Sequence, residues 1–178
     1  MSRKIINLVL FSTIVLLLIS TPCSAAESEK TRHITGDGID IYFMQDKVFG
    51  VINNHPIWAI YNCGSDISGE IDKNGTYITF SFKFSKEREK RFTGTFGKKE
   101  IGLGDIEKTD KKLIYHVFVN GKEYLFSVIP EKIEENHMVN SVIEGTLDER
   151  RIMRFHVDGE LCPFATTGII LIVSGAML

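Results

Sequence analysis

Histidine and cysteine are the residue types in this chain that could support catalysis or bind a metal. No two of the five histidines lie three or four residues apart, and no acid or cysteine beside them completes a familiar ligand set. The sequence therefore predicts no metal site and no bound cofactor. The histidines are His33, His55, His116, His137 and His156.

Cys63 and His55 form the one pair that could act as a thiol–imidazole couple, since they lie eight residues apart on either side of an apolar stretch. A nucleophilic cysteine also needs surroundings that favour the thiolate, and Asp66 beside it works against that. No third residue is evident that would orient the imidazole, and no G-x-S-x-G motif occurs. We therefore expect a non-catalytic protein, with a small thiol-dependent enzyme that uses Cys63 and His55 as the alternative.

The first 26 residues have the organisation of a secretory signal peptide. Arg3 and Lys4 precede an apolar run over 5–19, Pro22 follows it and would break a helix, and small residues follow in "CSAA". We expect residues 1–26 to be removed, which leaves residues 27–178 as a single β-rich domain outside the cytoplasm, either periplasmic or secreted. An uncleaved membrane anchor is the alternative, although the run is short for a helix that crosses ~30 Å of hydrocarbon.

Removal of the signal peptide would leave two cysteines, Cys63 and Cys162, in a compartment that permits disulfides. We predict a disulfide between them, which would close a loop of roughly 100 residues and restrict the unfolded chain. The alternative is two buried thiols that act as small apolar side chains.

A basic stretch stands out in a chain whose formal net charge is −2. That overall charge argues against nucleic acid as a partner. A local cluster of cations could instead hold an anionic component of the envelope, such as a lipid headgroup or a polysaccharide. The alternative is a solvated loop whose lysines protect strand edges from pairing. The predicted patch consists of Lys83, Lys86, Arg88, Lys90, Arg91, Lys98 and Lys99.

The structural elements that position these residues are indicated by the stretch "ISGEIDKNGTYITFSF" over 67–82. Apolar and polar residues alternate on both sides of its Asn-Gly turn. This pattern is typical of a β-hairpin with one wet face. Five such units recur, with turns of four or five polar residues. With 39–45 added, we predict a mainly β protein, an antiparallel hairpin meander of about ten strands that forms a curled sheet, a barrel or a sandwich.

A glycine recurs near the start of four of these units, at Gly50, Gly69, Gly94 and Gly145. Glycine within a strand weakens it and commonly marks a bulge, a sharp bend or the close approach of another backbone. We therefore expect these glycines to bend the sheet in step, so that it curls.

The last 18 residues, "LCPFATTGIILIVSGAML", carry no charge. Pro163 suits the first position of a helix, and a helix that is apolar all round must be enclosed. A short buried C-terminal helix is the preferred prediction, and a central strand over "GIILIV" is the alternative. A membrane span is a third possibility, which would make the chain a membrane-tethered accessory protein.

Together these features predict an exported, non-catalytic envelope or secreted protein with a structural or ligand-binding role. The predicted partners are an anionic envelope component or a small apolar ligand. Membrane contact would use the C-terminal tail. The sequence does not indicate whether the protein is a monomer or an oligomer.

Overall fold

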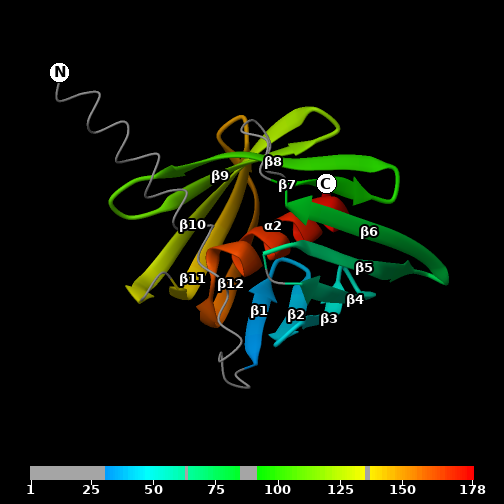
Figure 1. The fold of residues 1–178 in the computed structure, drawn as a ribbon. Coiled ribbons are helices and arrows are strands. Elements are labelled where there is room, and N and C mark those ends of the chain that lie inside the picture. Colours follow the sequence, from blue (N-terminus) through cyan, green and yellow to red (C-terminus); the bar gives the residue numbers. More distant parts are fainter. Residues whose placement is uncertain (1–30, 63, 85–91, 135–136) are drawn as a thin grey trace.

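A computed structural model describes residues 31–62, 64–84, 92–134 and 137–178. These residues form twelve strands followed by one helix (Figure 1). The strands are β1 (Arg32–Gly36), β2 (Ile39–Met44), β3 (Lys47–Ile52), β4 (His55–Asn62), β5 (Asp66–Lys73), β6 (Thr76–Phe84), β7 (Phe92–Phe96), β8 (Lys99–Lys108), β9 (Leu113–Val119), β10 (Lys122–Glu134), β11 (His137–Leu147) and β12 (Arg150–Leu161), and the helix is α2 (Pro163–Met177).

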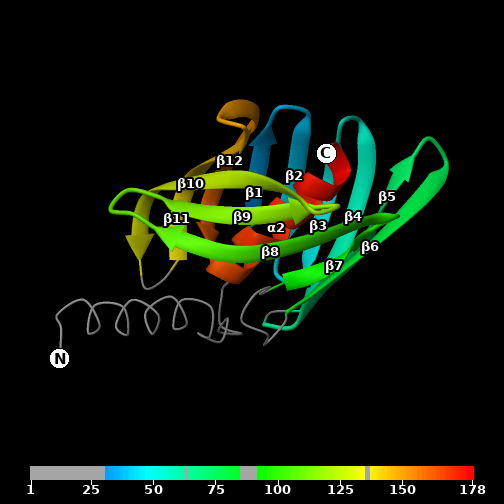
Figure 2. The same ribbon diagram turned by 90° about the horizontal axis from the view of Figure 1, so that it is seen from above.

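The strands form a closed antiparallel barrel in which each strand pairs with the next one along the chain. β1 closes the ring by pairing with β12, where Ile34 lies opposite Val157. Figure 2 shows the ring from a second direction. The predicted meander is confirmed, and of the three predicted forms the chain adopts the barrel. Closure removes the free sheet edges that an open meander of this size would expose.

All five predicted hairpins are present, but their turns are tighter than the sequence indicates. The turn between β5 and β6 consists of Asn74 and Gly75, whose φ angles are 56° and 84°. Positive φ at both positions is typical of the two-residue turns that match the twist of paired strands. The strands therefore extend into polar residues that the sequence assigns to the turns.

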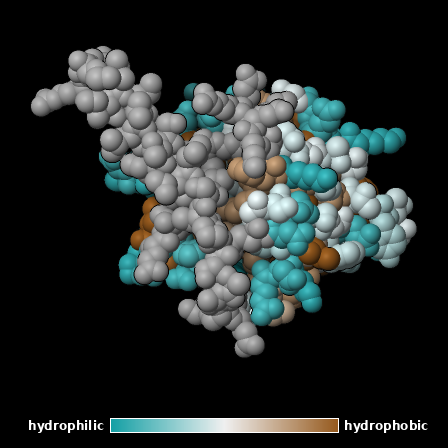
Figure 3. All heavy atoms as spheres, viewed as in Figure 1, coloured by the Kyte–Doolittle hydropathy of each residue, from teal (hydrophilic) through white to brown (hydrophobic). Residues whose placement is uncertain are grey.

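Side chains alternate between the two faces of the barrel wall. In β6, Phe80 and Phe82 are buried in the interior, whereas Thr79 and Lys83 are exposed. The same alternation gives β9 a regular pattern of buried and half-buried residues. Figure 3 shows the outer side of this pattern, where hydrophilic side chains dominate and hydrophobic ones lie between them.

The C-terminal helix α2 fills the barrel and confirms the preferred prediction for the tail. Fourteen of its fifteen residues are buried, and it contacts strands on several sides of the ring, including β3, β7 and β12. Figure 1 shows it in the middle of the ring of strands. A helix with its side chains is ~10 Å across, and an eight-stranded barrel has room only for side chains. Twelve strands leave space for a helix as the core. No helix among the described residues has the length and apolarity that a membrane span requires.

Three of the four in-strand glycines, Gly50, Gly69 and Gly94, lie where the backbone of a neighbouring strand approaches closely, whereas Gly145 faces the side chains of Met153 and Phe126. A Cβ atom at Gly94 would lie 1.9 Å from the carbonyl oxygen of Ser81 and 2.7 Å from the Cα atom of Phe82. Both atoms belong to the backbone of β6, so neither can turn aside. The glycine therefore permits a close approach of β6 and β7 that any side chain would prevent.

Candidate functional site

The interior of the barrel has little room for a ligand beside α2. The described residues leave a cavity of about 10 Å³ at one end, between Arg32, Tyr61 and Cys162. A space of this size holds about one water molecule. This cavity is too small for the predicted small apolar ligand, and the candidate binding surfaces described below lie on the outside of the wall.

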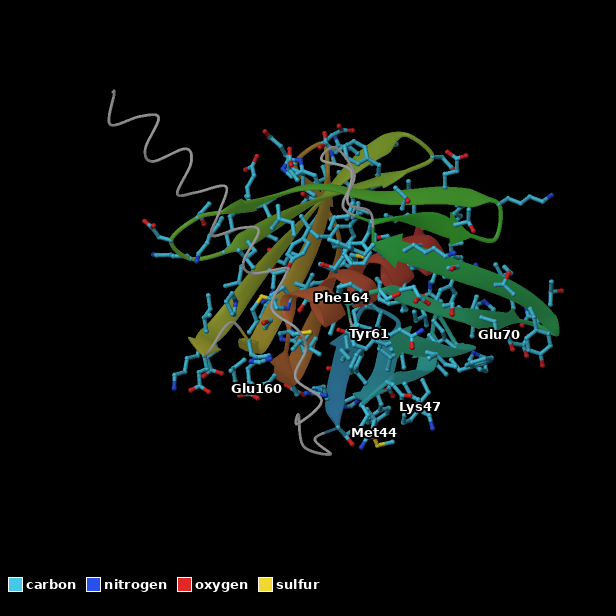
Figure 4. All side chains as sticks on the ribbon, viewed as in Figure 1. Met44, Lys47, Tyr61, Glu70, Glu160 and Phe164 are labelled. Atoms are coloured by element: carbon cyan, nitrogen blue, oxygen red, sulfur yellow. The ribbon has the colours of Figure 1, made fainter. Side chains whose placement is uncertain are left out.

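Cys162 caps the N-terminus of α2 at this end of the barrel. Its extended backbone places the Sγ atom 3.4 Å from the amide nitrogen of Ala165, which donates to it. The Tyr61 hydroxyl lies 3.3 Å from the same Sγ atom, and the Tyr61 ring packs edge-on against Phe164. Figure 4 shows Tyr61 and Phe164 together inside the ring. The start of α2 and Tyr61 on β4 therefore fix the position of the Cys162 thiol.

The predicted disulfide between Cys63 and Cys162 is half described, because Cys63 lies outside the described residues. Cys162 contacts Tyr61, which precedes Cys63 by two positions. Two residues of chain span at most ~7 Å, so this contact is compatible with the pairing. The disulfide stays a prediction that the intact mass of the non-reduced protein would check.

The predicted alternative of a Cys63–His55 couple gains no support from β4. His55 begins this strand and Asn62, the residue before Cys63, ends it. With a rise of ~3.3 Å per residue, the seven steps from His55 to Asn62 cover about 23 Å. That separation weighs against a thiol–imidazole contact, which needs the two groups within hydrogen-bond reach.

Two of the described histidines, His33 and His116, contact carboxylates on the outer face of the barrel. His116 on β9 bridges its neighbours, with Nδ1 2.7 Å from Glu123 on β10 and Nε2 3.2 Å from Glu107 on β8. His33 on β1 lies 2.7 Å from Asp40 on β2. The described part of the chain holds no group of three or more histidine, cysteine or acidic residues that could bind a metal ion. These contacts connect neighbouring strands.

Three residues of the predicted basic patch can be placed. Lys83 and Lys98 are exposed, whereas the Lys99 ammonium donates to the carbonyl oxygen of Gly175 at 2.9 Å. Lys99 thus binds the C-terminal end of α2, where cations are favoured. Partial burial, with a smaller contribution from Lys73, lowers the pKa of Lys99. The other four members lie outside the described residues and are Lys86, Arg88, Lys90 and Arg91.

A second cationic surface, which we call the lysine groove, lies between the β8–β9 connection and β10. It has a volume of about 420 Å³, and its polar lining has four lysines but only two acids. Ile129 and Ile133 on its β10 side are 40% and 52% exposed. The four lysines are Lys108, Lys111, Lys112 and Lys132, and the acids are Asp110 and Glu131.

The groove exists because β10 continues past the strand beside it. The pairing of β9 with β10 ends at Leu113 and Val128, while β10 continues to Glu134 with β11 as its other neighbour. Pro130 has no amide hydrogen and Lys132 is charged, and both features discourage another strand from pairing at an open edge. This groove was not predicted because its lysines come from two separate segments, although "KTDKK" over 108–112 is a local signal of positive charge.

The Tyr115 hydroxyl is an interior group whose ionisation gives a testable pH dependence. It is fully buried on β9 and has no hydrogen-bond partner of good geometry among the described residues. Burial raises the pKa of Tyr115 and Cys162 adds to the effect, while the nearby Thr167 hydroxyl on α2 offsets part of it. The phenol therefore stays protonated in the folded protein at pH values where an exposed tyrosine ionises.

We expect Tyr115→Phe to reduce alkaline unfolding. Above about pH 10 the tyrosine of the unfolded chain loses its proton while the folded one keeps it, so stability falls as the pH rises. The phenylalanine variant lacks this loss, and its stability at pH 7 stays within about 1 kcal/mol of the parent because a poorly paired hydroxyl is removed. Urea unfolding at pH 7 to 11 checks this. Tyr77→Phe, at a 64% exposed position, should follow the parent, and a Tyr115→Phe profile equal to the parent would contradict the prediction.

Comparison with known protein families, curated proteins and solved structures finds no match to this chain.

Proposed function

We propose that this chain is an exported, non-catalytic protein that holds an anionic component of the cell envelope on the outer surface of its barrel. The observation that carries the proposal is that α2 occupies the interior, which directs binding to the outside. Export rests on residues 1–26, which lie outside the described residues, and it stays a prediction.

The lysine groove is the described surface that best fits an anionic ligand. Four lysines from two segments of the barrel wall line one hollow together with two acids, which gives the lining a formal charge of +2, and the Lys132 ammonium also pairs with Glu134 on the same strand. Exposed isoleucines beside them offer apolar contact. Each exposed ion pair contributes little alone, about 0.2–1 kcal/mol, so that affinity depends on several pairs acting together.

Retention on an immobilised anionic polysaccharide tests the proposal with the chain that begins at residue 27. We expect the groove variant to bind about ten-fold more weakly than a control of equal net charge, since it loses four favourable pairs. The groove variant replaces four lysines by glutamine, at Lys108, Lys111, Lys112 and Lys132, and the control replaces Lys47, Lys73, Lys122 and Arg150.

A third variant separates the groove from the predicted basic patch. It carries glutamine at Lys86, Arg88, Lys90 and Arg91. Loss of retention in this variant alone would move the anionic site to that stretch. Equal retention of all variants and the parent would contradict an anionic partner altogether.

A further inference from the structure

The outer face of β2, β3 and β4 concentrates exposed apolar side chains. Tyr42, Phe49 and Trp58 lie side by side in one row across the three strands. Phe49 is 38% and Trp58 is 50% exposed. The rows on either side add four more apolar residues. We call this surface the aromatic face, and its members are Tyr42, Met44, Phe49, Val51, Pro56, Trp58 and Ile60.

The aromatic face is the outer side of a wall whose inner side is the barrel core. Ile41, Val48 and Ala59 on the same strands point inward and are buried, so the core does not require the apolar residues outside. No described segment covers this face, and contiguous exposed apolar surface of this kind commonly marks an interaction site. Aromatic residues and methionine are the types enriched where proteins bind one another.

Carboxylates border the aromatic face on two opposite sides. Asp40 lies on β2, next to Val51 in its row; its side chain is 57% exposed and lies 2.7 Å from the His33 ring. Glu70 lies on β5 opposite Trp58, and the indole nitrogen of Trp58 donates to it at 2.8 Å. Asp72 on β5 adds a third acid at that border, whereas Lys47 is the one base in the three rows. Figure 4 places Glu70, Met44 and Lys47 on the outside of these strands. A partner that matches this surface is cationic at its ends and apolar between them.

The spacing of the two acidic borders defines the partner further. β2 and β5 are three strand spacings apart, which is about 14 Å and separates Asp40 from Asp72 at the far end of the same row. Glu70 lies one row further along β5, roughly 16 Å from Asp40. In an extended peptide, residues i, i+2 and i+4 point to the same side, and i and i+4 are about 13–14 Å apart. We propose that the aromatic face binds an extended segment of a partner protein with basic residues at i and i+4 and an apolar residue at i+2. This site is separate from the lysine groove and does not depend on it.

Other occupants fit the aromatic face less well. His33 and Tyr42 stack with ring centroids 4.3 Å apart, and Tyr42 and Phe49 stack at 5.7 Å. These three rings turn their faces toward one another, which leaves little of them for a sugar, and the hexasaccharide measurement below tests whether the Trp58 ring alone binds one. The face covers roughly 300 Å² at three strands by three residue pairs, well below the ~800 Å² per partner of a standard interface between two copies. The bordering carboxylates repel nucleic acid.

Trp58 provides a direct probe, because it is the one tryptophan in the chain. The peptide Arg-Ser-Leu-Ser-Arg-Ser-Leu-Ser-Arg, with blocked ends, has the required spacing. We expect it to shift the tryptophan fluorescence and to bind at least five-fold more tightly than Arg-Arg-Arg-Ser-Ser-Ser-Ser-Leu-Leu, which has the same composition.

Two variants of the bordering acids locate the site. Glu70→Gln and Asp40→Asn should each weaken binding about three- to ten-fold through loss of a charge-assisted contact. Glu144→Gln on β11, outside the aromatic face, should leave it unchanged, and circular dichroism verifies that each variant is folded. Equal affinity for the two peptides would overturn the proposal. So would a fluorescence response to a neutral hexasaccharide but not to the peptide, or a dimer by light scattering that responds to Phe49→Ser.

Discussion

Replacement of Ile170 by aspartate is expected to unfold the protein. Ile170 lies in the middle of α2, is fully buried, and belongs to the same hydrophobic core as the inward side chains of the wall. An unpaired carboxylate at such a position costs several kcal/mol, through either burial of the charge or protonation of the group. Because the total stability of a domain is only ~5–15 kcal/mol, we expect a loss of more than about 4 kcal/mol. Urea unfolding followed by far-ultraviolet circular dichroism measures it.

Two further variants show whether the effect comes from enclosure of the helix. Ile152→Asp places the same charge on the outer face of β12, where the side chain is 37% exposed, and should change the stability by less than about 1 kcal/mol. Ile170→Ala introduces no charge and should cost about 2–5 kcal/mol through the cavity it leaves. A parent-like unfolding midpoint for Ile170→Asp would mean that α2 does not fill the barrel in solution.

Substitutions in α2 are expected to cause a large loss of stability because the helix forms the centre of the core. Apolar side chains of the wall point inward from all twelve strands, and α2 supplies the centre against which they pack. A barrel of this width without its helix would leave a large unfilled space. The final part of the chain is therefore needed to stabilise the strands that come before it.

The local elements of this fold were predictable because their signals are local. Alternating side chains and Asn-Gly turns identify the hairpins, and Pro163 marks the start of the helix. The β-branched run "GIILIV" fits a strand equally well, so the sequence alone left both forms open. The position of this segment inside the barrel favours the helix, because a helix satisfies its backbone hydrogen bonds within itself whereas a strand needs a neighbouring strand.

The features that were not predicted depend on contacts between distant residues. β1 is five residues long, and it pairs with β12 more than 100 residues later. Without that pairing, the sequence could not distinguish a barrel from a curled sheet or a sandwich. The lysine groove joins residues 108–112 to Lys132, and the aromatic face depends on the register of three strands. No spacing along the chain encodes these relationships directly.

A second large effect is expected for Gly94→Ala in the barrel wall. The new methyl group would overlap the Ser81 carbonyl oxygen and the Phe82 Cα atom, which are backbone atoms fixed by the pairing of β6 with β7. Relief requires the two strands to separate, which weakens their hydrogen bonds and the packing against α2. We expect a loss of about 3 kcal/mol or more, at the upper end of what overpacking costs. Thermal and urea unfolding measure it.

Gly104→Ala is the matched control, because it adds the same methyl group to the neighbouring strand β8. Its nearest contact would be the Cε2 atom of Phe118 at 2.9 Å, and the next atom is 3.7 Å away. A ring edge can rotate aside where a backbone carbonyl cannot, so we expect a change of less than about 1 kcal/mol. Similar losses for the two variants would show that both positions respond to a general intolerance of β-strands for added side chains. A much larger loss at Gly94 would show that the closed wall depends on the close approach of backbones at that glycine.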